Sequence, residues 1–264
     1  MEGERRVVSY LRLSVTDRCN LRCCYCMPPQ GIQRLPHEEI LTFEEIVAVV
    51  QAAVSLGISK FRLTGGEPLV RRGVIGLIRM IRAVAGVQEM AMTTNATLLA
   101  DRAQALAAAG LDRINASLDS LDPTRYAALT YGGDLTTALA GIAAAERAGL
   151  LPIKINCVVE KSSAEPDAQA VAHYAAEHGY QIRFIPRMDL ARGTFGVIET
   201  GGGGDCPRCN RLRVTSNGWV RPCLFADVAF SVRKLGPLQA LRSAIVSKPG
   251  SGSSTLQPMV RIGG

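Results

Sequence analysis

The stretch "LRLSVTDRCNLRCCYCMP", residues 11–28, joins a strand-like run to four closely spaced cysteines. Residues 11–16 are typical of a β-strand. Cys19, Cys23 and Cys26 follow on the next loop with the spacing C-x3-C-x2-C. Three thiolates on one short loop can hold one face of a metal ion or cluster. A structural zinc site, which usually has four protein ligands, and thiols without a partner are the alternatives.

Strand-like and helix-like runs alternate along the rest of the chain. The expected strands are 11–16, 60–66, 87–95, 112–120, 152–160 and 180–186. The expected helices are 43–57, 71–85, 97–109, a helical region that ends at Gly149, and 165–178. Six βα units predict an α/β fold with a parallel sheet and helical crossovers. They are too few for a closed eight-stranded barrel. A partial (β/α)6 TIM-like barrel or a doubly wound sheet fits, and in both the site lies at the carboxyl ends of the strands.

The pattern changes after Pro186, so we expect residues 1–190 to form the barrel and 191–264 to form a smaller C-terminal segment. The glycine-rich region that begins at residue 191 predicts a loop or linker. Asn217-Gly218 predicts a two-residue hairpin turn, and 237–247 predicts a helix. The remaining tail is poor in core-forming residues and is expected to be flexible.

The composition indicates in which cell compartment the protein works and which class of binding partner it has. The 264 residues include eight cysteines, no secretion signal is recognisable, and no apolar run approaches the length of a membrane span. We therefore expect a cytoplasmic protein whose thiols stay reduced. The net charge of +7 is consistent with an anionic partner or with a solvated basic surface.

A second cysteine set lies near the end of the chain. Cys206, Cys209 and Cys223 have the spacing C-x2-C-x13-C, and the expected hairpin brings Cys223 back towards the other two. A degenerate zinc ribbon is the alternative interpretation. His173 and His178 lie on an expected helix of the barrel and are not interpreted as ligands.

The first cysteine motif, with Tyr25 before its last cysteine, resembles that of the radical S-adenosylmethionine superfamily. "TGGEP", residues 64–68, matches the glycine-glycine-glutamate turn of that superfamily after the second strand. The resemblance implies a [4Fe–4S] cluster on Cys19, Cys23 and Cys26, with one iron open to the cofactor. Cys24 is interpreted as a bystander, because adjacent cysteines cannot both bind comfortably while Cys26 does. The implied S-adenosylmethionine contacts are Tyr25, Gly66, Glu67, Ser117 and Met188.

The segment "CPRCNRLRVTSNGWVRPCLF", residues 206–225, resembles the auxiliary-cluster segment of the GTP 3′,8-cyclase family, and Gly263-Gly264 matches the double-glycine end of that family. The resemblance implies a small C-terminal subdomain with a second [4Fe–4S] cluster on Cys206, Cys209 and Cys223. A 5′-deoxyadenosyl radical would take hydrogen from ribose C3′ of GTP, and the carbon radical would close onto guanine C8. Further implied partners are an electron donor such as a flavodoxin or ferredoxin, a downstream enzyme that forms the cyclic pyranopterin, and a second copy in a homodimer. Neither nucleic acid nor a membrane is implied.

Basic residues recur on the expected strands. Lys60 and Arg62 share one face of the second strand. Buried cations are costly unless an anion pairs with them, so a polyanion inside the barrel is expected unless these faces point outward. The resemblance implies a set of GTP contacts: Arg12, Lys60, Arg62, Thr93, Lys154, Arg183, Arg211 and Arg213.

Three segments depart from the cyclase pattern. Seventeen residues separate Met188 from Cys206, where that family has several dozen more. "RFIPRMD", residues 183–189, lacks the usual glutamate, and "EKSSAEPD", residues 160–167, lacks the usual glycine and asparagine. Two alternative functions are a two-cluster radical enzyme that acts on a peptide and a non-catalytic iron–sulfur or nucleotide-binding relative.

Overall fold

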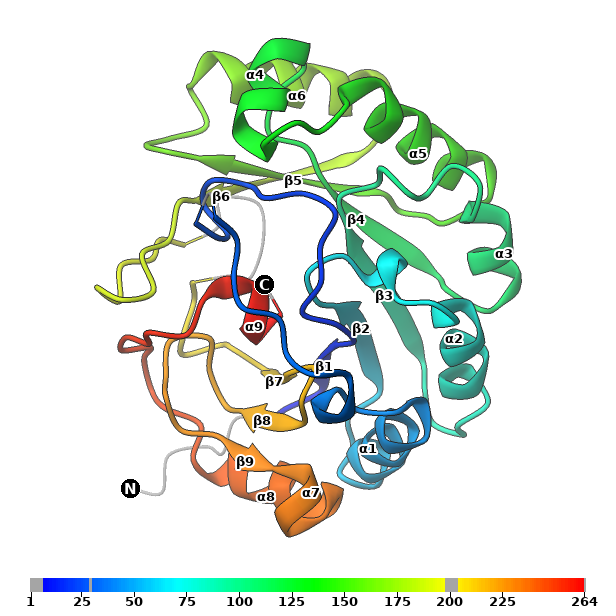
Figure 1. The fold of residues 1–264 in the computed structure, drawn as a ribbon, viewed down its shortest axis with the longest axis vertical. Helices are drawn as coiled ribbons and strands as arrows, with labels where there is room; N and C mark the ends of the chain where they lie inside the picture. The colour runs from blue at the N-terminus through cyan, green and yellow to red at the C-terminus, as the bar shows by residue number, and fades with distance from the viewer. Residues whose placement is uncertain (1–6, 29, 198–203, 264) are drawn as a thin grey trace.

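The computed structural model describes residues 7–28, 30–197 and 204–263. Its described strands form one curved sheet in the order β6-β5-β4-β3-β2-β1-β7-β8-β9 (Figure 1). The strands are β1 (Tyr10–Ser14), β2 (Lys60–Thr64), β3 (Glu89–Thr94), β4 (Arg113–Ser117), β5 (Lys154–Val159), β6 (Gln181–Pro186), β7 (Arg211–Val214), β8 (Trp219–Arg221) and β9 (Phe230–Ser231). Neighbours from β6 to β7 are parallel. The expected partial barrel is confirmed.

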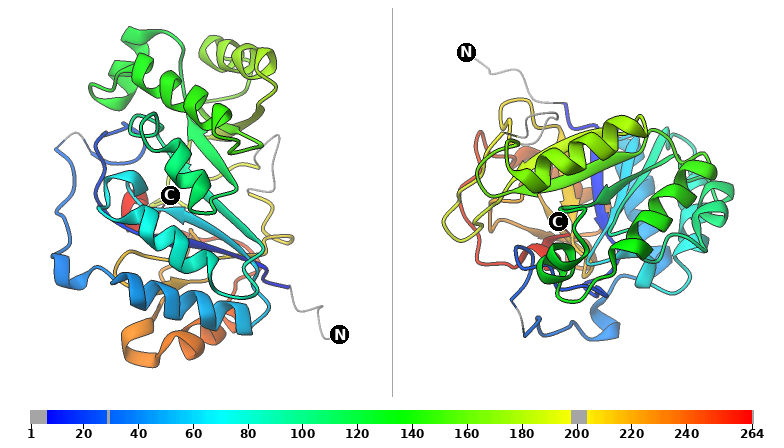
Figure 2. Two further views of the ribbon diagram at one scale, coloured as in Figure 1. Left: turned by 90° about the vertical axis from the view of Figure 1, so that its right-hand side faces the viewer. Right: turned by 90° about the horizontal axis from the view of Figure 1, so that it is seen from above.

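Most helices cover the outer side of the curved sheet, whereas the last one lies on its concave side (Figures 1 and 2). The helices are α1 (Phe43–Ser55), α2 (Val74–Arg82), α3 (Ala103–Ala108), α4 (Pro123–Thr130), α5 (Leu135–Arg147), α6 (Pro166–Glu177), α7 (Val232–Leu235), α8 (Pro237–Val246) and α9 (Met259–Ile262), with short 3-10 helices at His37–Glu39 and Pro68–Val70. The single helical region expected before Gly149 is two helices, because Tyr131 has a left-handed conformation between them. Within the described ranges, no helix is both long and apolar enough to span a bilayer.

Strand alternation divides the sheet into two chemically different faces. Leu11 and Leu13 are buried in the core between sheet and helices. Arg12, between them, points to the other face, as Arg62 does at the paired position of β2. The apolar residues thus hold the helices, and the concave face carries polar and basic side chains. This differs from the Val, Ile and Leu layers that usually fill a barrel interior.

The second cysteine segment continues the barrel sheet. β7 pairs in parallel with β1, and β8 turns back antiparallel to β7, so the expected hairpin is confirmed. Its turn is not the expected two-residue one: Thr215 N donates to the Trp219 carbonyl at 3.0 Å, so residues 216–218 form a three-residue turn, with a positive φ at Gly218 alone. The chain beyond residue 190 therefore shares one sheet with the barrel (Figure 2).

The C-terminal tail does not match the expectation of a flexible end. Val260 and Ile262 of α9 are buried, and the Gly263 carbonyl accepts hydrogen bonds from Arg213 Nη1 at 3.1 Å and Thr64 Oγ1 at 3.3 Å. The prediction missed this packing because the tail has few apolar residues, and three of them, Met259, Val260 and Ile262, are enough to pack it onto the sheet, although Leu256 stays exposed. Gly264 lies outside the described residues.

Candidate functional site

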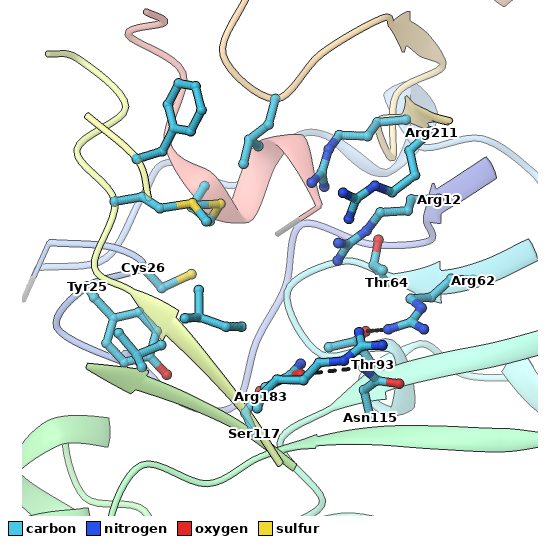
Figure 3. A pocket seen from close by; sticks show the side chains of 18 of the residues that line it. Arg12, Tyr25, Cys26, Arg62, Thr64, Thr93, Asn115, Ser117, Arg183 and Arg211 are labelled. Carbon is cyan, nitrogen blue, oxygen red and sulfur yellow. Dashed lines mark hydrogen bonds between the residues drawn. The ribbon is translucent and has the colours of Figure 1, made fainter. Parts of the chain in front are cut away.

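A cavity of about 330 Å³ opens on the concave face, at the carboxyl ends of the barrel strands. Both cysteine sets line it: Cys19, Cys23, Cys26, Cys206, Cys209 and Cys223. Figure 3 shows Tyr25 and Cys26 at one side of this space, and Arg12, Arg62, Arg183 and Arg211 extending into it from other strands. The topology thus brings the two sets, far apart in sequence, to one site.

The first cysteine loop presents three thiols to the cavity and turns one away. Cys24 is exposed and does not line the cavity; its backbone N–H is bound by the Leu129 carbonyl. The Sγ of Cys19 accepts a hydrogen bond from Leu21 N at 3.4 Å. Burial raises the pKa of Cys23, and burial raises the pKa of Cys26 to about 12. Thiols held neutral in this way can bind as thiolates when a cationic cluster supplies the missing charge, so the donor set fits an iron–sulfur cluster.

The Gly65-Gly66 turn after β2 packs directly on this loop. Gly66 N donates to the Thr16 carbonyl, and Glu67 N donates to the Arg18 carbonyl, both at 2.9 Å. A Cβ on Gly66 would lie 2.3 Å from the Arg18 oxygen. Only glycine permits this approach, so the turn and the cysteine loop form one unit that lines the cavity.

The Glu67 side chain lies away from the cavity lining. Its carboxylate accepts hydrogen bonds from Leu69 N at 3.0 Å, Thr94 Oγ1 at 2.9 Å and Asn95 N at 2.8 Å. Burial raises the pKa of Glu67 to about 7. The carboxylate therefore ties the end of β2 to the end of β3, and any cofactor contact from Glu67 would come from its backbone.

Asp119 is a site residue that the sequence prediction missed. It lines the cavity, accepts a hydrogen bond from Tyr25 Oη at 2.6 Å, and accepts a second from Val158 N at 2.8 Å. Burial raises the pKa of Asp119 to about 6. Its position two residues after Ser117, past the end of β4, was the available signal. Asp119 holds the Tyr25 ring beside the cysteine loop.

Polar residues at the centre of the concave face complete the wall. Ser117 and Met188, expected near the cofactor, line the cavity, and so does Thr93, whose Oγ1 accepts from Arg62 Nη1 at 3.4 Å. Asn115 and Asn156 line it as well and were not predicted as site residues, although strand alternation put both on polar faces.

Five of the expected GTP contacts are arginines at the cavity: Arg12, Arg62, Arg183, Arg211 and Arg213. Burial lowers the pKa of Arg213 to about 10, with a contribution from the charge of Arg211. Burial, together with the charges of Arg113 and Arg183, lowers the pKa of Arg62. Across the described part of the chain, no carboxylate forms an ion pair with Arg62, Arg183 or Arg213. Such a concentration of positive charge suits an anionic ligand.

The two expected lysines do not line the cavity. Lys60 is half-exposed, and its Nζ lies 3.9 Å from a Glu89 carboxylate oxygen. Lys154 stands at the start of β5, and burial and the charge of Arg183 lower its pKa to about 8. Both lysines stand at the amino ends of their strands, away from the residues that line the cavity.

The second cysteine set is held by one lysine that joins both of its parts. Lys248 Nζ donates to the Arg211 carbonyl at 2.6 Å and to the Pro222 carbonyl at 2.9 Å. These residues follow Cys209 and precede Cys223. Burial raises the pKa of Cys209, but Lys248 and the Arg211 backbone lower it by more, so the net pKa lies below the usual value. This lysine therefore favours a thiolate at Cys209.

The cysteines do not converge on a point. Among the side chains that the structure describes, no three His, Cys, Asp or Glu residues are close enough together to hold a single metal ion. A four-iron cluster is wider than one ion and takes its cysteines from separate corners.

The sequence matches known proteins over nearly its whole length. Residues 13–171 match the Radical SAM superfamily. A GTP 3′,8-cyclase of Pelotomaculum thermopropionicum is 41% identical over 84% of this chain and 82% of its own. One from Thermodesulfovibrio yellowstonii is 37% identical over 98% of each chain. That alignment runs over 316 positions, more than the 264 residues of this chain, so the relative carries internal residues that this chain lacks.

Solved structures share the fold at low sequence identity. "Native anSMEcpe with bound AdoMet" has a TM-score of 0.66 at 16% identity and covers 91% of this chain and 81% of that chain. Streptococcus suis SuiB bound to S-adenosylmethionine has a TM-score of 0.63 at 15% identity and covers 92% of this chain and 65% of that chain.

Proposed function

The chain belongs to the radical S-adenosylmethionine superfamily and, within it, to the GTP 3′,8-cyclases, and from this premise we propose the reaction that it catalyses. The reaction converts GTP to (8S)-3′,8-cyclo-7,8-dihydroguanosine 5′-triphosphate. The observation that carries the proposal is the shared cavity, where Arg62, Arg183 and Arg213, none of which forms an ion pair with a carboxylate among the described residues, lie beside both cysteine sets.

In the proposed site each group of residues has a distinct task. Cys19, Cys23 and Cys26 would hold the first [4Fe–4S] cluster, and Tyr25, the Gly66 turn, Ser117 and Met188 border the space for S-adenosylmethionine. When bound, these cofactors would supply the radical chemistry that removes hydrogen from the ribose. Cys206, Cys209 and Cys223 would hold a second [4Fe–4S] cluster beside the guanine end of GTP.

The arginines bind and orient the triphosphate. Arg12 of β1 lies opposite Arg62 of β2 in the strand register, and on its other side it lies opposite Arg213 of β7. Guanidinium groups match phosphate oxygens with two parallel hydrogen bonds. Burial, with a smaller contribution from the charge of Arg211, lowers the pKa of Arg213, and a bound triphosphate would favour its charged form.

An anaerobic assay tests the reaction. The reconstituted, reduced protein is mixed with S-adenosylmethionine and GTP, and 5′-deoxyadenosine and a cyclised GTP product are measured together. We expect both. Deoxyadenosine without a cyclised product would favour a different substrate, such as a peptide. The absence of both would favour a non-catalytic relative.

A binding assay tests the arginine set separately. We expect Arg213→Gln to weaken GTP binding at least about tenfold, because it removes one charge-assisted phosphate contact. Lys60→Gln is the matched control, since Lys60 already pairs with Glu89 outside the cavity lining. Equal losses in the two variants would contradict the proposed GTP position.

The wider setting follows from the family. We propose that the protein works in the cytoplasm, takes electrons from a flavodoxin or ferredoxin, and passes its product to an enzyme that forms the cyclic pyranopterin. A homodimer is also proposed. Sedimentation of the purified protein tests the dimer, and a single protomer mass would contradict it.

A further inference from the structure

Three segments that are distant in sequence meet beside the second cysteine set. They are residues 188–195 from the shortened linker, 223–226 after β8, and 251–262 from the tail. Their apolar side chains form a small cluster separate from the main core: Met188, Leu190, Phe195, Cys223, Leu224, Phe225, Met259 and Ile262. Cys223 thus belongs both to this group of apolar side chains and to the cavity lining.

An aromatic pair is the centre of this contact. The rings of Phe195 and Phe225 are stacked, with centroids 4.4 Å apart and planes at 29°. Both rings line the cavity. A Cβ on Gly252 would lie 2.8 Å from Phe225 Cβ and 3.2 Å from the Phe195 ring, so the tail packs closely on the pair. Phe195 therefore contacts both the loop that follows Cys223 and the tail.

Backbone hydrogen bonds hold Phe195 in place. Asp189 and Thr194 form a two-way backbone pair at 3.0 and 2.9 Å. Thr255 N donates to the Leu190 carbonyl, and Ser253 N donates to the Phe225 carbonyl, both at 2.8 Å. The tail is therefore joined by main-chain hydrogen bonds both to the linker that carries Phe195 and to the loop after Cys223.

This arrangement stands where the chain is short. Only seventeen residues separate Met188 from Cys206, and the Thermodesulfovibrio relative carries internal residues that this chain lacks. A loop that carries a ligand needs a fixed support if three cysteines are to meet one cluster. In this chain the described support on the Cys223 side is the Lys248 bond to the Pro222 carbonyl, the Phe195–Phe225 pair and the tail.

We propose that Phe195 is a positioning residue for the second [4Fe–4S] cluster, and that its ring replaces scaffold that this chain lacks. The inference rests on the proposed function, because it requires the second cluster. The Phe195 ring fixes the Cys223 loop and excludes water from the side of the cavity where the second [4Fe–4S] cluster would bind. Removing it frees that loop, while the first cysteine loop keeps its own contacts with Gly66.

The test compares Phe195→Ala, Phe195→Leu and the matched control Val197→Ala. Val197 lies two residues further along the same linker, is 62% exposed, and does not line the cavity. After anaerobic reconstitution, iron and sulfide per chain are measured together with the electron paramagnetic resonance of the reduced clusters. The wild type and Val197→Ala should hold about eight iron atoms.

We expect Phe195→Ala to fall to about four iron atoms per chain. Its remaining signal should still shift when S-adenosylmethionine is added, because the first cluster is intact. Phe195→Leu, which keeps apolar volume, should recover much of the second cluster. Eight iron atoms and an unchanged second signal in Phe195→Ala would overturn the inference.

Two further outcomes also decide the question. If Phe195→Ala loses both clusters in parallel, Phe195 supports the whole fold and its specific role is wrong; Phe195→Leu provides the same comparison if the alanine variant does not fold. If the wild type holds only about four iron atoms, the proposed second cluster fails, and the inference fails with it before any variant is made.

Discussion

The two cysteine sites lie in one cavity but rest on different kinds of support. The first loop follows β1 and contacts the ends of the next strands: the Gly66 turn after β2, Asn95 after β3 and Asp119 after β4. The second set is held by Lys248, the Phe195–Phe225 pair and the tail. The first site uses adjacent elements of a parallel sheet, and the second uses single contacts between distant segments.

This difference indicates which of the two cysteine sites tolerates changes in distant parts of the sequence. Parallel strands bring their carboxyl ends together wherever the helices between them vary in length. The second site is not fixed by a sheet in this way. The backbone hydrogen bonds of Ser253 with Phe225 and of Thr255 with Leu190 form only when the linker and the tail have matching lengths. We therefore expect the first site to resist distant substitutions and the second to respond to them.

The largest expected effect separates two adjacent cysteines of the first loop. Cys23 lines the cavity, whereas Cys24 is exposed and does not line it. Cys23→Ser should abolish formation of 5′-deoxyadenosine, because the first cluster loses a ligand. Cys24→Ser should keep nearly full activity. Equal losses would show that the ligand assignment in this loop is wrong.

A steric test asks whether the Gly66 turn supports the first site alone. Gly66→Ala places a Cβ 2.3 Å from the Arg18 oxygen, and we expect it to destabilise the fold by about 1–3 kcal/mol and to lower the affinity for S-adenosylmethionine. Gly76→Ala is the control: it lies in α2 with no atom within 4 Å of the new Cβ, and should be neutral or stabilising by about 0.5–1 kcal/mol. Thermal melting and cofactor titration measure both. An undisturbed Gly66→Ala protein would mean that the turn and loop can separate.

The second site can be weakened from the tail. Thr255 Oγ1 accepts a hydrogen bond from Arg221 Nη2 at 3.2 Å and donates to the Asp227 carboxylate. Thr255→Val leaves both partners short of one bond, and we expect a loss of about 1–2 kcal/mol in unfolding free energy together with faster loss of iron from the second site. Thr124→Val, at an exposed position of α4, should change neither. Iron loss from the first site instead would contradict the difference between the two supports.

Periodicity was sufficient to predict the barrel and to put Lys60 and Arg62 on one face of β2, but it did not tell which face is concave; Arg12 and Ser117 were expected at the site only from the family resemblance. Neither periodicity nor the resemblance was sufficient for Asp119 and Phe195. Asp119 lies past the end of its strand, where alternation no longer fixes direction. Phe195 lies in a glycine-rich linker and packs on Phe225 and the tail, contacts between distant segments that no local sequence pattern shows. Lys60 and Lys154 were expected at the cavity from their face of the sheet, but they lie at the amino ends of their strands. Strand alternation fixes the face of the sheet on which a side chain lies and not its distance from the cavity mouth.

The smallest expected effect concerns Lys154 and pH. Burial, together with Arg183 and Arg113, lowers the pKa of Lys154 to about 8, so its ammonium is present below that pH and lost above it. A bound triphosphate favours the charged form and raises this pKa. GTP binding should therefore weaken about fourfold between about pH 7 and about pH 8.5, because the free protein must first take up a proton. Lys154→Arg keeps its charge over this range and should flatten the profile, whereas Lys60→Arg should keep the wild-type slope. If Lys154→Arg leaves the slope unchanged, the triphosphate does not extend down to β5, and the arginines nearer the cysteines hold it alone.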